Sequence, residues 1–479
     1  MDEKMRQFRA FERKYSLFDL KVDGIYIWER LRKSIWSQIR KQLDTGQAHT
    51  QLDLDTSDNI EGAKLLVKNI INKNPFNVKQ HDYLFFGHQR RKKEPDSQWW
   101  DIYCDPIHEQ CSFDYVHLEK PYLLEHRSPA KTGRLRYAEL LVYSGTVQRK
   151  LGFHKVQLSQ DAKSHCRKIE AGIQEAFGVE IDIVNRVTRL LSNRRSRLWL
   201  YEKLLERVDP GIVVVVVSYG EQKSLLIEAC QKKGIPTVEL QHGVIYPDHL
   251  AYNFSGDRTK RVFPDYLLVW GEFWKNNAEF PIPDKRVIPV GYPYLEQRRK
   301  LYTGNNSTDQ LLFISQGTIG EQLSKFALEV HQHPEIDYDV VYKLHPGEYD
   351  RWREEYPWLV DANFEVIDQS DPPLYQLFAG SSAQIGVGST AVYEGLAFDL
   401  ETFVYDCSGR DVLQSLISDG AATLVQSADE LAAKLGDGDV VFDREYYFKS
   451  NASISTATSF VGKRQSFRRG VARIPILSV

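Results

Sequence analysis

Three short polar segments each follow a strongly apolar run and carry side chains that suit phosphate chemistry. They are Gln241-His242-Gly243, Lys343-Leu344-His345-Pro346 and Gly388-Ser389-Thr390. The third segment stands where a strand is expected to end and a helix to begin. Such a turn offers free backbone N–H groups, hydroxyls and the positive end of a helix dipole to an anion. Taken alone, it is equally well explained as a Ser/Thr helix cap.

Two further features extend this anion site toward a whole nucleotide. Glu394 follows Thr390 by about one helical turn, where its carboxylate can hold a ribose diol. His345 and Lys343 lie on a second strand-end loop and are expected to reach the same phosphates, although a lysine at a strand end is often simply solvated. We therefore expect a site for a nucleotide diphosphate, and a nucleotide-sugar enzyme is the leading interpretation.

The position of these segments strengthens the prediction. In open α/β sheets, ligands bind in the crevice at the carboxyl ends of the strands. Another apolar run, Leu311 to Ile314, ends in a polar segment that we add to the expected donor-binding set, namely Ser315, Gln316, Gly317 and Thr318. Several polar motifs at the expected carboxyl ends of strands are hard to explain by helix capping alone.

His242 is the predicted catalytic base. An unperturbed histidine has a pKa near 6.5, which suits general-base catalysis at neutral pH, and the following Gly243 permits close approach. His345 is the second catalytic candidate, because charge develops on the leaving phosphate. A lone histidine is often structural, so three alternative bases stay open: Glu221, Asp248 and His249.

Apolar runs alternate with helix-forming segments through both halves of the chain. Gly211 to Ser218 is an unbroken β-branched run, of the type found in parallel strands buried on both faces. Residues 134–147 and 162–207 are expected to be mainly helical. The alternation predicts an α/β protein with two Rossmann-like parallel-sheet domains facing across a cleft.

The expected divisions of the chain follow from this alternation and from the polar linker near 300–310. We expect a helical N-terminal extension over 1–60 and an acceptor domain over 61–305. A nucleotide-sugar-binding domain is expected over 306–440, and a C-terminal tail over 441–479 is expected to pack back on the first domain.

The helical extension carries an apolar stripe. Trp28, Leu31, Ile35 and Ile39 recur at a spacing of three or four residues, as in an amphipathic helix. The favoured interpretation is a helix that packs on the first domain. The alternative is a basic interfacial helix with tryptophans at the lipid headgroups, which would give the protein a peripheral membrane contact.

Composition narrows the classes of partner and compartment. The 62 basic and 65 acidic residues nearly cancel in a chain of 479 residues, so no nucleic acid partner is expected. The five cysteines are scattered and odd in number, which favours a reducing compartment. Without a signal-like start or an apolar run of about 20 residues, we expect a cytoplasmic protein, with attachment to the inner face of the cell membrane as the alternative.

No metal or other cofactor is expected. Cys104, His108 and Cys111 form the one metal-like cluster in the sequence, with too few ligands for a structural zinc site. Asp53-Leu54-Asp55 lies in a polar segment rather than at a strand end. A helix dipole and a histidine can together neutralise a diphosphate, so an obligatory metal is not needed.

The motifs and their order resemble the GT-B glycosyltransferases, in particular the CDP-glycerol glycerophosphotransferases and the capsular and cell-surface polysaccharide transferases. Those enzymes carry a Trp-His-Gly motif, a His-Pro loop and a Ser-Ser or Ser-Thr turn. Here Gln241-His242-Gly243, His345-Pro346 and Ser389-Thr390 match in order. The resemblance covers roughly 205–435. Bacterial sialyl- and Kdo-transferases share the last two motifs, and UDP-GlcNAc 2-epimerases share a segment similar to Gly388 to Glu394.

The resemblance implies a metal-independent, inverting transfer of a sugar from a nucleotide-activated donor to a cell-surface glycan or lipid-linked acceptor. Gly388-Ser389-Thr390 stands where glycerophosphotransferases would have an aspartate and paired serines, which favours a sugar donor over a polyol phosphate. The alternatives are a nucleotide-sugar 2-epimerase on the same scaffold, a CDP-glycerol-type transferase and a non-catalytic nucleotide-sugar-binding protein. The nucleotide stays open among CMP, CDP, UDP and GDP.

Overall fold

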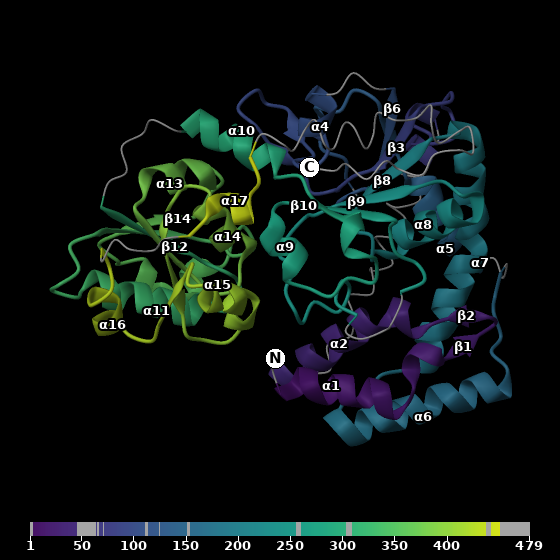
Figure 1. Cartoon of the computed structure of the whole chain (residues 1–479), viewed down its shortest axis with the longest axis horizontal. Helices are drawn as coiled ribbons and strands as arrows, with labels where there is room; N and C mark the ends of the chain where they lie inside the picture. Colours follow the sequence, from purple (N-terminus) through teal and green to yellow (C-terminus); the bar gives the residue numbers. More distant parts are fainter. Residues whose placement is uncertain are drawn as a thin grey trace.

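The structure is a computed structural model that contains two parallel β-sheets, each flanked by helices (Figure 1). It describes residues 3–45, 64, 67–69, 71–110, 114–123, 125–150, 154–254, 260–302, 309–436 and 442–450. Asp53, Asp55, Cys111 and most of the predicted tail lie outside the described residues, as does most of the polar linker near 300–310.

The first sheet has seven strands in the order β11-β10-β9-β8-β3-β6-β7, and every neighbouring pair is parallel. Its strands are β3 (Tyr83–Phe86), β6 (Tyr115–Glu119), β7 (Leu135–Tyr137), β8 (Ile212–Val216), β9 (Thr237–Leu240), β10 (Tyr266–Val269) and β11 (Val287–Pro289). The chain builds outward from β3 to β7 and then returns to the other side of β3 with β8. The strand order therefore reverses between β3 and β8.

The second sheet has six parallel strands in the order β14-β13-β12-β15-β16-β17. They are β12 (Gln310–Ile314), β13 (Asp339–Lys343), β14 (Glu365–Ile367), β15 (Ala383–Gly386), β16 (Glu401–Tyr405) and β17 (Thr423–Val425). Renumbered within the domain, this is the 3-2-1-4-5-6 order of a dinucleotide-binding Rossmann sheet. The predicted fold class, α/β with two Rossmann-like parallel-sheet domains, is confirmed.

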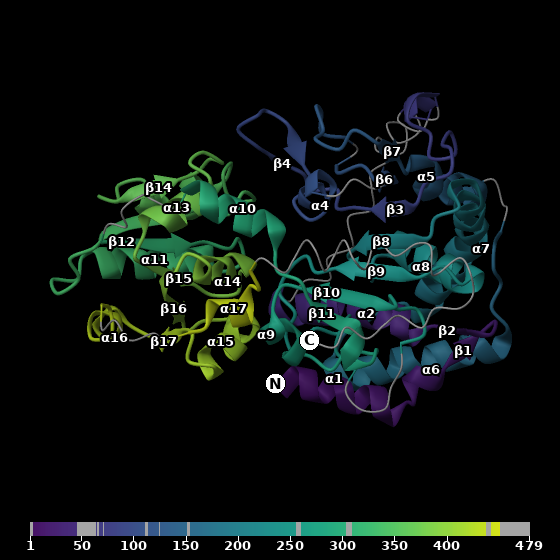
Figure 2. The same cartoon turned by 45° about the horizontal axis from the view of Figure 1, so that its top comes forward.

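Helices fill the connections between the strands (Figures 1 and 2). The first half contains α1 (Glu3–Lys14), α2 (Trp28–Thr45), α4 (Asp105–Gln110), α5 (Glu139–Lys150), α6 (Gln160–Phe177), α7 (Ile183–Val208), α8 (Glu221–Lys233), α9 (Glu272–Asn276) and α10 (Pro293–Tyr302). The second contains α11 (Gly320–His331), α12 (Trp352–Glu355), α13 (Leu374–Gly380), α14 (Thr390–Leu396), α15 (Gln414–Ser418), α16 (Ala428–Ala432) and α17 (Arg444–Tyr447).

Short elements complete the described chain. They are the hairpins β1 (Lys21–Val22) with β2 (Ile25–Tyr26) and β4 (Lys92–Lys93) with β5 (Trp99–Trp100), and the 3₁₀ turns η1 (Leu17–Asp19), η2 (Asp284–Arg286), η3 (Pro357–Leu359) and η4 (Arg410–Leu413).

Two helix predictions need correction. The segment 134–147 begins with strand β7, which pairs with β6, and only then becomes helix α5. The segment 162–207 is two helices, because α6 ends at Gly178, whose φ of +67° lies in the left-handed region that favours glycine. Asp182 then caps the first turn of α7 by accepting a hydrogen bond from the backbone N–H of Asn185.

The β-branched run over β8 is buried on both faces, as predicted. Ile212, Val214 and Val216 pack in one hydrophobic cluster, while Val213 and Val215 pack in another together with residues of α5, α7 and α8. Both faces of the strand are buried among apolar side chains, which explains why apolar and polar residues do not alternate in this part of the sequence.

The apolar stripe of α2 is buried inside the protein. Trp28, Ile35 and Ile39 are at most 1% exposed, and they pack with residues of α1, α6 and the start of α7. The packing interpretation is therefore the one that the structure supports for these residues, because the buried tryptophans have no access to lipid headgroups. In the part of the chain that the structure describes, no helix is long and apolar enough to cross a membrane.

The two domains share one hydrophobic cluster. Trp274 and Phe273 of α9 pack against Tyr393 of α14, with ring centroids 4.8 and 5.8 Å apart. The start of the predicted tail joins this cluster, since the indole N–H of Trp274 donates to the carbonyl of Tyr447 over 2.8 Å. Residues 442–450 thus return to the first domain after the second domain is complete.

Candidate functional site

The reversal point of the second sheet brings two of the predicted donor loops together. Strands β12 and β15 are neighbours, and the loops that follow them contain Gln316 and Gly388. A Cβ added to Gly388 would lie 3.1 Å from Oε1 of Gln316 and 2.8 Å from the carbonyl oxygen of Gly409. Only glycine fits at this position, and the crevice where Rossmann sheets bind ligands lies here.

The hydroxyls of this crevice have different surroundings. Ser389 is the N-cap of α14, and its Oγ accepts a hydrogen bond from the backbone N–H of Ala391 over 3.2 Å. Ser315 is buried and donates to Glu348 over 3.1 Å while it accepts from Tyr342. Ser389 and Thr390 therefore remain accessible candidates for a ligand, whereas Ser315 belongs to the framework.

Glu348 organises the loop that carries His345. This carboxylate is fully buried and accepts hydrogen bonds from the backbone N–H of His345 over 2.8 Å, from Ser315 and from Tyr356. His345 itself is exposed, and its Nδ1 accepts from the backbone N–H of Gly347 over 3.1 Å. A neutral His345 therefore carries its proton on Nε2. Among the described residues, no hydrogen bond joins His345 to Ser389 or Thr390.

Lys343 is a framework cation at the end of β13. It is 8% exposed and donates to the hydroxyl of Tyr349 over 2.9 Å and to the carbonyl of Gln369. Burial lowers the pKa of Lys343 to about 8. The predicted alternative of a solvated strand end is wrong, because the side chain is enclosed.

Glu394 lies where the two domains meet. It accepts a hydrogen bond from the hydroxyl of Tyr375 over 2.9 Å, and the ammonium of Lys92, from the first domain, sits 4.8 Å from the centre of the Tyr375 ring. Burial raises the pKa of Glu394 to about 7, against the opposing effects of Tyr375 and Lys92. The carboxylate is therefore poised to change charge near neutral pH.

His242 follows β9 and is held by three tyrosines. Its Nε2 lies 3.1 Å from the hydroxyl of Tyr219, its Nδ1 lies 3.4 Å from the hydroxyl of Tyr252, and its backbone carbonyl accepts from Tyr103 over 2.7 Å. Burial is the largest cause that lowers the pKa of His242 well below its ordinary value, with smaller contributions from His88, His249, Lys223 and Lys33. The imidazole is thus neutral at pH 7, and its lowered pKa makes it a weaker base than the ordinary value near 6.5 would imply.

A buried carboxylate fixes the tautomer of His242. Tyr252 donates its hydroxyl hydrogen to Glu239 over 2.6 Å, so its oxygen can only accept from Nδ1 of His242. Nε2 then carries the lone pair and accepts from Tyr219. The chain of contacts from Glu239 through Tyr252 to His242 orients the base as a third group does in other activated sites.

The three alternative bases lie in different surroundings. His249 stacks on the same tyrosines as His242, 4.8 Å from the Tyr252 ring, and burial lowers its pKa to about 3. Asp248 pairs with Arg9 over 3.3 Å, and Glu221 pairs with Arg197 over 2.7 Å. Of the three, only His249 shares the environment of His242.

Several neighbours of the candidate site were missed in the sequence. His88 follows β3 with its ring centroid 6.5 Å from that of His242, and Tyr103 and Lys92 also come from the region before residue 200. The Gly87-His88 segment at the end of a predicted strand was the available signal, because β3 and β8 flank the reversal point of the first sheet.

The loops of the two domains touch each other. A Cβ added to Gly243 would lie 3.6 Å from Oγ1 of Thr390, an ordinary contact distance. The His242 loop of the first domain and the Ser389-Thr390 turn of the second therefore lie side by side.

The described residues include one group with metal-ligating side chains. The ligand atoms of Asp101, Cys104 and His117 lie within 4.8 Å of one another, and all three residues are buried. Asp101 already accepts hydrogen bonds from the backbone N–H groups of His88, Tyr103 and Cys104. This carboxylate serves the turn that leads into α4, so its lone pairs are largely used within the protein.

No family model matches the chain, and no curated protein matches it. Solved structures with a similar fold include the UDP-GlcNAc 2-epimerase from Methanocaldococcus jannaschii, at 13% identity and a TM-score of 0.46 over 79% of this chain and 99% of that one. The wall teichoic acid polymerase TagF is 11% identical with a TM-score of 0.42 over 94% and 100%. The calicheamicin glycosyltransferase CalG4 is 12% identical with a TM-score of 0.45 over 83% and 100%.

Proposed function

We propose that this chain is a glycosyltransferase that moves a sugar from a nucleotide-activated donor to a cell-surface glycan or lipid-linked acceptor, without an obligatory metal. The observation that carries the proposal is the nearness of Gly243 to Thr390, since the His242 loop then lies close to strand ends of the kind at which Rossmann sheets bind ligands.

The proposed roles follow from the geometry. The loops containing Gln316 and Gly388 would hold the donor phosphates, and Glu394 would hold the ribose once its carboxylate is ionised. His242 would accept the proton of the acceptor hydroxyl through Nε2, with Glu239 and Tyr252 holding the ring. His345 would offer its Nε2–H to the leaving phosphate.

A two-step experiment tests this function. A thermal-shift screen of CMP, CDP, UDP and GDP should show stabilisation by one of them, because a ligand that binds only the folded state raises its stability. The sugar donors of that nucleotide are then incubated with the protein alone and with glycan and prenyl-phosphate-linked acceptors. Transfer that requires an acceptor supports the proposal, whereas conversion of the donor alone would identify a 2-epimerase instead.

A further inference from the structure

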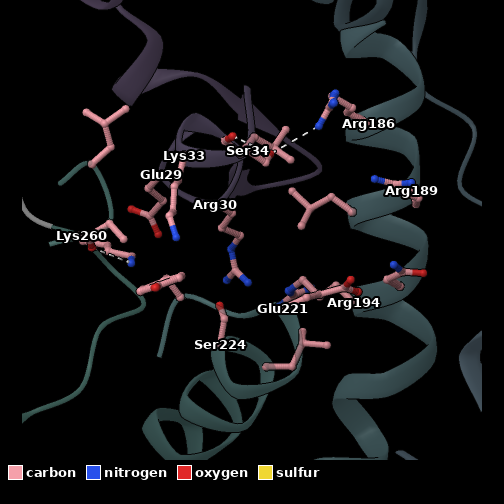
Figure 3. Close-up of a pocket in the computed structure, with 17 residues that line it drawn as sticks. Glu29, Arg30, Lys33, Ser34, Arg186, Arg189, Arg194, Glu221, Ser224 and Lys260 are labelled. Carbon is pink, nitrogen blue, oxygen red and sulfur yellow. Dashed lines mark hydrogen bonds between the residues drawn. The ribbon is translucent and has the colours of Figure 1, made fainter. Parts of the chain in front are cut away.

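A partly open basic cavity lies beside the candidate site in the first domain. It has a volume of about 230 Å³ and is bordered by α2, α7, the start of α8 and residues near 250 and 260. Figure 3 shows side chains from these separate elements converging on it. A space of this size holds about seven to eight waters at about 30 Å³ each, which is enough for a diphosphate.

The lining of the cavity is strongly cationic. Its charged side chains are six cations and two glutamates: Arg30, Lys33, Arg186, Arg189, Arg194, Lys260, Glu29 and Glu221. Glu221 is paired with Arg197, a residue outside the lining. Arg30 and Arg194 both pair with Glu228 over 2.8 and 2.5 Å, so one carboxylate offsets one of these two positive charges.

Three of the cations form no ion pair among the described residues: Lys260 is buried within electrostatic reach of Glu29 and Glu239, whereas Lys33 and Arg189 are exposed. Lys260 is 8% exposed, and its one hydrogen bond among the described residues is a long one, 3.4 Å, to the carbonyl of Ala251. Lys33 lies 3.7 Å over the ring of Tyr219 and forms no ion pair in the described chain. Arg189 likewise has neither a hydrogen bond nor an ion pair there, and Figure 3 shows it reaching from α7 toward the cavity.

A buried cation without a counter-charge is costly, because its desolvation is not repaid. Of the three cations, Lys260 is the buried one, and an anion in the cavity would compensate it while also meeting the exposed Lys33 and Arg189. Lysine offers point charges and arginine a planar fork, and both suit the oxygens of a phosphate. The other lining residues include leucines from three elements, Leu31, Leu190, Leu225 and Leu250, which suit an organic group attached to that phosphate.

The cavity is connected to the candidate base. Tyr219 lines it, lies beneath Lys33 and contacts Nε2 of His242 through its hydroxyl. Tyr219 therefore stands between the cavity and His242, and a ligand in the cavity would lie one side chain away from the candidate base.

We infer that this cavity binds the phosphate or diphosphate group of the acceptor, and so selects phosphate-bearing acceptors. That the bound molecule is an acceptor rests on the proposed function. That it carries a phosphate group rests on the cavity alone.

Calorimetric titration with inorganic pyrophosphate and with geranyl diphosphate tests it on the full chain. Both probes should bind, and Arg189→Ala and Lys33→Ala should each weaken binding about ten- to a hundredfold, as expected for hydrogen bonds to a charged group. The matched controls are Arg167→Ala and Lys168→Ala on α6, which are exposed and do not line the cavity. Raising the salt concentration should weaken binding further.

The two probes distinguish the source of the phosphate. Tighter binding of geranyl diphosphate supports a lipid-linked acceptor, and equal binding supports an acceptor recognised by its phosphate alone. Absence of binding by both probes, or equal loss in the cavity and control variants, overturns the inference. A loss of nucleotide affinity in the cavity variants as large as the loss of pyrophosphate affinity also overturns it, because the cavity would then belong to the donor.

The outcome separates this inference from the proposed function. If pyrophosphate binds through Lys33 and Arg189 but no nucleotide binds, the cavity is an anion site and the glycosyltransferase proposal fails. If a nucleotide binds and sugar is transferred while pyrophosphate does not bind, the transferase stands and the cavity is not its acceptor site.

Discussion

The hydroxyl of Tyr219 lies 3.1 Å from Nε2 of His242. The same tyrosine forms part of the wall of the basic cavity and carries Lys33 above its ring. One side chain thus separates the candidate base from the candidate acceptor pocket. An acceptor hydroxyl that approaches Nε2 must displace this phenol or share its hydrogen bond.

The first prediction concerns His242→Ala. If His242 is the base, turnover should fall about a hundred- to ten-thousandfold, while donor affinity stays nearly unchanged because the contacts to the nucleotide are in the other domain. Steady-state kinetics and nucleotide titration measure the two effects separately. His165→Ala on the exposed face of α6 is the control. Near-normal turnover, or a variant that folds but cannot bind the donor, would contradict the assignment.

The pH profile gives a second test of the same residue. A base must be deprotonated, so the rate rises with pH through its pKa and then levels off. Since burial lowers the pKa of His242 well below its ordinary value, the ionisation of His242 should not make kcat depend on pH above about pH 6.5. Tyr219→Phe removes a hydrogen bond that favours the neutral imidazole, so the acidic limb should move to higher pH. A profile that does not move means that Tyr219 does not donate to Nε2.

Much of the second domain could be predicted from its sequence, because its strands are compact apolar runs and its motifs stand at their ends. The loops that contain Gln316 and Gly388 follow two adjacent strands, so the local pattern of apolar runs and polar ends was sufficient to predict their positions. The neighbours of His242 could not be found this way. His88 and Lys92 reach the site only through the strand order of a sheet assembled from distant segments, and Glu239 and Glu348 act while buried within strands and loops, where a single sequence gives no sign of their partners.

Glu394→Gln should make nucleotide binding independent of pH. The pKa of Glu394 is raised to about 7 in the folded protein, so its carboxylate is largely protonated below that value. A ribose diol is held best by the ionised form, so wild-type affinity should increase as the pH rises through about 7. The variant should show about ten- to a hundredfold weaker binding at pH 8. Equal affinity of both proteins at pH 8 would remove Glu394 from the site.

The raised pKa of Glu394 also predicts how the stability of the folded protein changes with pH. A carboxyl whose folded pKa is raised binds a proton more tightly in the folded state than in the unfolded one. Its stabilising contribution is present below the unfolded pKa of about 4.5 and is lost as the pH rises through about 7. Glu394→Gln should therefore gain in melting temperature relative to the wild type between about pH 4 and about pH 8, which bracket that window.

A matched pair of glycine variants tests the crevice. Gly388→Ala would place its Cβ 2.8 Å from the carbonyl oxygen of Gly409, so the backbone must move, whereas Gly243→Ala meets only an ordinary contact at 3.6 Å. Overpacking of this kind costs about 1–3 kcal/mol, and it falls on the proposed phosphate loop. Nucleotide affinity should fall at least tenfold in Gly388→Ala and change little in Gly243→Ala. The reverse order would move the donor site away from this loop.

The return of residues 442–450 to the first domain has a mechanical consequence. The chain passes between the domains at α10 and again before α17, and Arg299 of α10 and Arg444 of α17 both pair with Asp399 of the second domain. These two ion pairs share one carboxylate, so both chain crossings are attached to the second domain at the same point. We expect the second domain to pivot about this shared point, so that closure would bring the Thr390 turn back to the same place beside Gly243.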